Sequence, residues 1–163
     1  MSKEKIYIAY GSNLNIPQMT MRCPEAKIIG ASEIKDYELV FRGSKTGFYA
    51  TIEPCEGATV PVLLWSISKQ DELHLDMYEG YPHFYGKEQM TLPLNEQEIE
   101  AMVYTMPSHH QLGMPSQRYV DTILEGYETA GFDVSILYEA LDKTEERLEQ
   151  EPPQMAFLQQ GWW

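Results

Sequence analysis

The sequence has few basic residues. It contains 12 Lys and Arg residues against 25 Asp and Glu residues, so its formal net charge at pH 7 is -13. It has no basic cluster that could neutralise phosphate groups or an anionic lipid surface. We therefore expect neither nucleic acid nor a membrane as a partner.

Cysteines and long apolar runs are also scarce. The two cysteines are Cys23 and Cys55, and the N-terminal stretch MSKEKIYIAY lacks the apolar core and cleavage site of a secretory signal. The longest apolar stretch lies around residues 62–65, whereas a membrane-spanning helix needs roughly 20 apolar residues. These features predict a cytoplasmic protein in a reducing compartment.

Short alternating or β-branched runs fill the first two thirds of the chain. They predict about seven strands, over residues 6–10, 27–34, 38–41, 49–53, 59–67, 84–94 and 99–106. Gly, Pro and Asn residues between these runs indicate hairpin connections. We therefore predict an α+β fold, with a small curled mixed sheet or β-barrel of about seven strands, flanking helices and a helical C-terminal segment.

Capping residues and apolar spacing predict the helices. The expected helices span residues 16–22, 69–79, 117–130 and a segment from residue 133, whose charged end over residues 143–151 should fray. Asn15, Ser68 and Ser116 are the expected N-terminal caps, and Gly80 and Gly131 are the expected stops.

The stretch IYIAYGSNL, residues 6–14, ends a predicted strand in Gly11, Ser12 and Asn13, just before a predicted helix. Successive backbone N–H groups in such a turn can converge on an anion. A glycine lets the ligand approach the backbone closely, and the hydroxyl and amide side chains add donors. The same three residues would equally suit a capped turn that binds nothing.

Glu79 lies at the predicted end of the second helix, near Tyr78, Tyr81, Phe84 and Tyr85. The C-terminal end of a helix carries partial negative charge and aromatic neighbours exclude water, so both effects should raise the pKa of Glu79. A carboxyl with a pKa near neutrality can accept and return protons at working pH. The alternative is an exposed glutamate above packed aromatic rings.

The two motifs together resemble those of the γ-glutamylcyclotransferase family, including its avirulence-induced-gene-like members. The matching residues are Tyr10 to Leu14 (YGSNL), followed by Glu79, Gly80 and Tyr85 in a Glu-Gly-x-x-x-x-Tyr pattern. The stretch PSQRYVDTILEGYETAG, residues 115–131, is similar to the helix that follows the barrel in this family.

This resemblance implies an enzyme that cleaves a small γ-glutamyl amide by cyclising its glutamyl group to 5-oxoproline, releasing an amine or amino acid. It implies Glu79 as the general acid/base, with no metal and no bound cofactor. The substrate-binding residues that it implies are Tyr10, Gly11, Ser12, Asn13, Leu14, Tyr85 and Tyr119. Tyr104, on a predicted strand, is a further candidate to line the cavity.

Two other functions remain open for these residues. A non-catalytic member of the family would bind a small molecule with the same turn, although a pure binder has no need of Glu79. A hydrolase with Ser12 as nucleophile would release glutamate instead, but YGSNL lacks the second glycine of a G-x-S-x-G motif.

The resemblance covers residues 5–131, which predicts a γ-glutamylcyclotransferase-like barrel domain over residues 1–131. Residues 132–163 are predicted to form a helical extension packed on the same domain. The final stretch QMAFLQQGWW is rich in apolar residues, and it could pack on its own domain or on a second copy in a homodimer.

Overall fold

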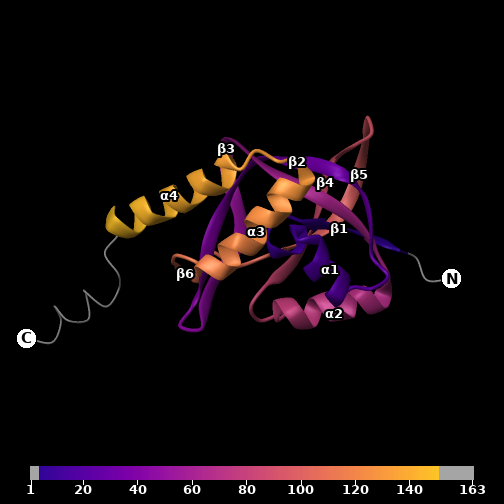
Figure 1. The fold of residues 1–163 in the computed structure, drawn as a ribbon, viewed down its shortest axis with the longest axis horizontal. Helices are drawn as coiled ribbons and strands as arrows, with labels where there is room; N and C mark the ends of the chain where they lie inside the picture. Colours follow the sequence, from indigo (N-terminus) through magenta and orange to yellow (C-terminus); the bar gives the residue numbers. More distant parts are fainter. Residues whose placement is uncertain (1–3, 151–163) are drawn as a thin grey trace, which may run out of the picture.

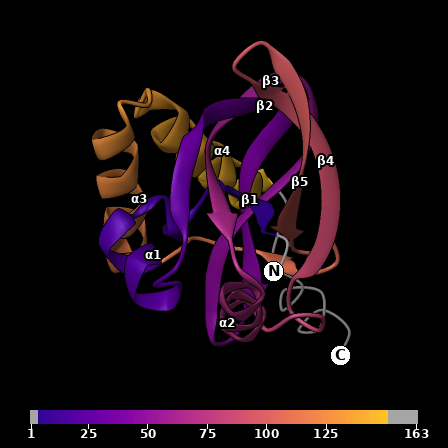
Figure 2. The same ribbon diagram turned by 90° about the vertical axis from the view of Figure 1, so that its right-hand side faces the viewer.

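Six strands form one mixed sheet in the computed structural model, which describes residues 4–150. The strands are β1 (Lys5–Ala9), β2 (Lys27–Ser44), β3 (Gly47–Ile67), β4 (Gly86–Leu94), β5 (Gln97–Thr105) and β6 (Gln111–Leu112). Their order across the sheet is β4-β5-β1-β3-β2-β6, and β1 and β5 run parallel while the other neighbours run antiparallel. The sheet curls into a half-barrel, which confirms the predicted α+β fold (Figures 1 and 2).

Two pairs of predicted strands are each continuous, which leaves five of the seven, and the sixth strand of the sheet, β6, was not predicted from the sequence. Residues 27–34 and 38–41 both belong to β2, and residues 49–53 and 59–67 both belong to β3. The register shifts between Lys35 and Tyr37, where Asp36 has a positive φ of 63° and its carboxylate accepts a hydrogen bond from the Gly57 N–H at 3.0 Å. The turn residues seen in the sequence therefore form a bulge, which bends two long paired strands instead of ending them.

Four α-helices and one short 3-10 turn complete the described part of the chain. They are η1 (Ser12–Leu14), α1 (Ile16–Arg22), α2 (Lys69–Glu79), α3 (Gln117–Ala130) and α4 (Ser135–Gln150). The predicted caps are confirmed: Asn15, Ser68 and Ser116 each accept a backbone N–H bond, and Gly80 and Gly131 end their helices with positive φ. In both views α2 lies below one end of the sheet (Figures 1 and 2).

The prediction that residues 143–151 fray is wrong for the residues that the structure describes. Helix α4 continues to Gln150, because Thr144 is buried one turn after Ala140 and Lys143 pairs with Glu38 of β2 at 2.5 Å. Burial on one face thus holds a turn whose sequence is mostly charged.

Helix α3 packs directly on the turn that follows β1. A Cβ atom at Gly126 would lie 2.6 Å from Leu14 Cβ and 2.8 Å from the Leu14 carbonyl oxygen, so only glycine permits this approach. Leu14 is itself fully buried. The position of the YGSNL turn therefore depends on contact with a helix more than 100 residues later.

The stretch QMAFLQQGWW lies outside the described residues, so its packing on this domain or on a second copy stays a prediction, as does the domain boundary at residue 131. Within residues 4–150, no helix combines the length and the hydropathy that crossing a membrane requires.

Candidate active site

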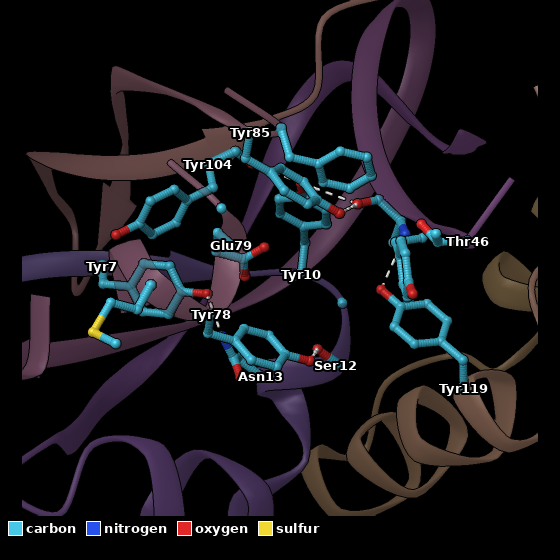
Figure 3. Close-up of a pocket in the computed structure, with 16 residues that line it drawn as sticks. Tyr7, Tyr10, Ser12, Asn13, Thr46, Tyr78, Glu79, Tyr85, Tyr104 and Tyr119 are labelled. Atoms are coloured by element: carbon cyan, nitrogen blue, oxygen red, sulfur yellow. Dashed lines mark hydrogen bonds between the residues drawn. The ribbon is translucent and has the colours of Figure 1, made fainter. Parts of the chain in front are cut away.

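A cavity of about 330 Å³ lies between the turn after β1, the end of α2 and strand β3 (Figure 3). Half of the residues that line it are aromatic, and among the described residues Glu79 is the one carboxylate in the lining. The lining residues are Tyr7, Tyr10, Gly11, Ser12, Asn13, Thr46, Tyr49, Ala50, Met77, Tyr78, Glu79, Gly80, Phe84, Tyr85, Tyr104 and Tyr119.

The cavity brings together eight of the nine residues that the sequence nominates. Tyr10, Gly11, Ser12, Asn13, Glu79, Tyr85 and Tyr119 all line it, and so does Tyr104. Leu14 is the exception, because it is buried behind the turn against Gly126 and does not line the cavity. Leu14 therefore affects the cavity only by holding the backbone of the turn in place.

The sequence predicted that the turn leads straight into α1. In the structure the turn first forms the 3-10 turn η1, and α1 begins two residues later. The Gly11 and Ser12 carbonyls accept bonds from Leu14 N and Asn15 N, each at 3.0 Å. Within residues 4–150, no acceptor is found for the N–H groups of Gly11, Ser12 or Asn13. Three neighbouring residues of the cavity lining therefore carry backbone donors that have no acceptor in the described part of the chain.

The side chains of the turn are occupied by contacts inside the protein. Ser12 Oγ and Tyr78 Oη are 3.1 Å apart, and Asn13 Nδ2 donates to Tyr7 Oη at 2.9 Å (Figure 3). Asn13 Oδ1 accepts a bond from Arg22 at 2.7 Å. The donors that this turn offers to a ligand are thus mainly its backbone N–H groups.

Glu79 is the last residue of α2, and Gly80 follows it with the left-handed φ of 65° that ends the helix. Its side chain is half-buried and points into the cavity (Figure 3). Loss of solvation in this aromatic surrounding raises the pKa of Glu79 to about 8, while the positive charge of Arg22 acts in the opposite direction. The shift has the sign predicted from the sequence, with burial as its main cause.

The tyrosine hydroxyls meet the backbone of β3 at Ala50. Tyr85 Oη donates to the Ala50 carbonyl at 2.6 Å, while Tyr119 Oη accepts a bond from Ala50 N at 3.0 Å. Tyr10 Oη donates to the Tyr104 carbonyl at 2.6 Å. Burial raises the pKa of Tyr10, Tyr85 and Tyr119, so these phenols stay protonated near neutral pH.

Sequence reasoning missed several residues of this site, above all Tyr7, Tyr49 and Arg22. Tyr7 lies on β1, three residues before the YGSNL motif begins, and because Tyr7, Ile8 and Ala9 are all buried, no alternation along the strand marks it out. Arg22 has no local signal, because its contacts depend on how α1 and α2 pack. In the described part of the chain, no group of His, Cys, Asp and Glu side chains could hold a metal ion.

Comparisons with known proteins agree with this geometry. The family model described as "Gamma-glutamyl cyclotransferase, AIG2-like" matches residues 7–122. The gamma-glutamylcyclotransferases of Bos taurus and Homo sapiens are each 30% identical over 135 residues, which span 77% of this chain and 71% of each relative. A solved structure of a gamma-glutamyl cyclotransferase superposes with a TM-score of 0.75 at 26% identity, covering 88% of this chain and 87% of the other. The chain therefore belongs to the AIG2-like gamma-glutamyl cyclotransferase family.

Proposed function

We propose that the protein cleaves a small γ-glutamyl amide by cyclising the glutamyl group to 5-oxoproline, with Glu79 as general acid/base. One observation carries this proposal: a carboxyl with a pKa of about 8 lines the same cavity as three residues whose backbone N–H groups have no acceptor within residues 4–150. Family membership supports the same reaction class.

The reaction needs one group that moves a proton between two nitrogens. The substrate's α-amine attacks its own γ-carbonyl carbon, forming the ring C–N bond, and the original amide C–N bond then breaks. Glu79 accepts a proton from the attacking amine and delivers it to the leaving nitrogen. A pKa of about 8 suits both steps near neutral pH, because the carboxyl is then easily protonated and easily ionised.

The turn supplies the second requirement, which is to hold negative charge. The N–H groups of Gly11, Ser12 and Asn13 suit the α-carboxylate of the glutamyl group or the oxyanion of the tetrahedral intermediate. Ring closure is intramolecular, so the protein gains rate chiefly by holding the substrate folded with its amine near the carbonyl. The aromatic walls of Tyr10, Tyr85 and Tyr119 would restrict the substrate to such a conformation.

The surroundings of Ser12 give little support to the hydrolase alternative. Within residues 4–150, the side chain that hydrogen-bonds to Ser12 Oγ is the phenol of Tyr78, and neither a histidine nor a carboxylate does so. A serine nucleophile needs an adjacent base to accept its proton. The two mechanisms differ in product, because hydrolysis releases glutamate and cyclisation releases 5-oxoproline.

The test is incubation with a panel of γ-glutamyl amino acids and γ-glutamyl amines, with 5-oxoproline and glutamate quantified by mass spectrometry. We expect 5-oxoproline from at least one substrate. We expect Glu79→Gln to lower kcat by about a thousandfold, the usual scale for loss of a general acid/base. Glu128→Gln, an exposed change of the same type on α3, should leave kcat unchanged.

Binding is measured separately from turnover in the same variant. Glu79→Gln should still gain thermal stability when the reactive substrate is added, since the turn that holds the anion is intact. Normal turnover by Glu79→Gln, or glutamate as the sole product, would contradict the mechanism. Binding without turnover across the whole panel, by the unmodified protein, would favour the non-catalytic alternative.

A further inference from the structure

The side chain of Arg22, at the C-terminal end of α1, joins the two halves of the site. Its Nη1 donates to Asn13 Oδ1 and its Nη2 donates to Gln18 Oε1, both at 2.7 Å. Its guanidinium carbon lies 3.7 Å from the centroid of the Tyr78 ring. Both arms and one face of this half-buried guanidinium are therefore in use.

The contact with Asn13 determines how the turn is oriented. The Asn13 amide has one oxygen, which accepts from Arg22, and one nitrogen, which donates to Tyr7 Oη at 2.9 Å. A cation beside the oxygen fixes which end of the amide faces α1 and which faces β1. Arg22 thereby fixes the side chain of the last residue whose N–H group lines the anion-binding turn.

The contact with Tyr78 extends this link to α2. Tyr78 immediately precedes Glu79, and its hydroxyl lies 3.1 Å from Ser12 Oγ. Arg22 packs on the ring of the same tyrosine. Tyr78 thus links the end of α2 to the turn in two ways. Its hydroxyl contacts Ser12, and its ring face contacts Arg22, which in turn donates to Asn13.

Arg22 also contributes charge. Phenol groups line the cavity around Glu79. Tyr78 comes from its own helix α2, and the others are Tyr7 from β1, Tyr10 after β1, Tyr49 from β3, Tyr85 before β4, Tyr104 from β5 and Tyr119 from α3. Of the described groups that act on the Glu79 carboxyl, Arg22 is the cation. An arginine stays protonated at any working pH, so this influence is constant.

We propose that Arg22 is a positioning residue of this site, which orients the Gly11–Asn13 turn through the Asn13 amide and holds the end of α2 that carries Glu79 beside this turn through the Tyr78 ring. The part that concerns turnover rests on the proposed function. The part that concerns the positions of the turn and of the α2 end does not.

Two substitutions separate the geometry from the charge. Arg22→Lys keeps the charge but loses the planar fork that reaches Asn13 and Gln18 together. Arg22→Gln loses the charge as well. Arg147→Gln, on α4 and outside the cavity lining, is the matched control for the loss of one positive charge.

The first readout is independent of catalysis. The ¹³C shift of the Glu79 carboxyl is followed through a pH titration and assigned by its absence in Glu79→Gln. We expect the midpoint to rise by about one pH unit in Arg22→Gln, the lower end of the effect of a nearby opposite charge. It should stay near the unmodified value in Arg22→Lys and Arg147→Gln.

The second readout uses the reactive substrate. KM should rise about tenfold in both Arg22 variants because the turn is misplaced. Only in Arg22→Gln should the acid limb of kcat/KM move to higher pH. If the unmodified protein makes no 5-oxoproline, the proposed function fails while the titration still decides the role of Arg22. An unchanged Glu79 midpoint in Arg22→Gln would overturn the proposal, since an arginine that merely packs two helices together would leave that midpoint unmoved.

Discussion

At the scale of single residues, the site places an acid where ionisation is unfavourable. The pKa of Glu79 is raised from its ordinary value of 4.5 to about 8 by loss of solvation. Between these two pH values the folded protein holds a proton that the unfolded chain has released. The free energy of unfolding therefore falls as pH rises through this window, so the feature that suits proton transfer also costs stability.

This cost predicts that Glu79→Gln stabilises the protein at alkaline pH. Since Glu79 is half-buried, we expect a gain in the free energy of unfolding of about 2 kcal/mol at pH 9, less than the full shift would give. At pH 4 the variant and the unmodified protein should differ little, because the carboxyl is protonated in both folded and unfolded states. Urea denaturation at the two pH values measures the difference, and a gain independent of pH would contradict the argument.

The sequence identifies the acid and the turn but not the residues that hold them. Glu79 can be singled out because it sits between a helix and a run of aromatic residues, and Gly11 to Asn13 because they interrupt an apolar strand. Arg22 cannot, because nine residues of sequence separate it from Asn13 and no spacing rule connects the two. Its role follows only from the packing of α1 against α2.

At the scale of elements, helix α3 fixes the YGSNL turn from behind. Gly126 would ordinarily be a weak point of a helix, and alanine there would favour helix formation by about 1 kcal/mol. Here the Cβ would meet the Leu14 backbone at 2.7 Å, so α3 would have to move away from the turn. The gain in helix propensity is smaller than the cost of that displacement.

Gly126→Ala should therefore destabilise the protein by about 2 kcal/mol despite the better helix former. It should also raise KM, because displacing α3 disturbs the turn and the Tyr119 hydroxyl together. Thr129→Ala, an exposed change on the same helix, is the control and should leave both quantities nearly unchanged. Thermal unfolding and steady-state kinetics measure the two effects, and a more stable Gly126→Ala protein would refute the role of this contact.

Helix boundaries follow from the sequence more closely than strand boundaries do. A few neighbouring side chains decide where a helix begins or ends. Ser68 and Asp71, for example, cap the start of α2, and such signals are local. Strands β2 and β3 continue through residues that usually form turns, because the pairing between two long partners holds a bulge in place. That pairing joins distant residues, so no short stretch could have revealed it.

At the scale of the whole molecule, α4 belongs to the same core as the sheet. Leu137 is 0% exposed and packs within the core cluster, whereas its neighbour Tyr138 is 46% exposed. The helix lies against β2, with Lys143 paired to Glu38. We therefore expect α4 to unfold with the sheet in one transition.

Leu137→Ala tests this expectation. Removing a fully buried leucine side chain should lower the free energy of unfolding by about 3 kcal/mol, whereas Tyr138→Ala should cost less than about 1 kcal/mol. Circular dichroism reports on the helices and near-ultraviolet signals on the aromatic core. Both should shift together in Leu137→Ala, and a separate early loss of helix signal would show that α4 unfolds as an independent unit.

The meeting of Tyr85 and Tyr119 at the backbone of Ala50 has a consequence for genetics. The atoms that matter there are a carbonyl and an N–H, which every residue except proline supplies, so replacing the side chain by another small one leaves the junction intact. A screen of all substitutions at Ala50 would therefore report only which side-chain sizes are tolerated, and would not detect the hydrogen bonds that the Ala50 backbone makes to the two tyrosines. Only chemical synthesis, exchanging the amide between Tyr49 and Ala50 for an ester, removes the N–H that donates to Tyr119 and so exposes how strongly that phenol depends on it.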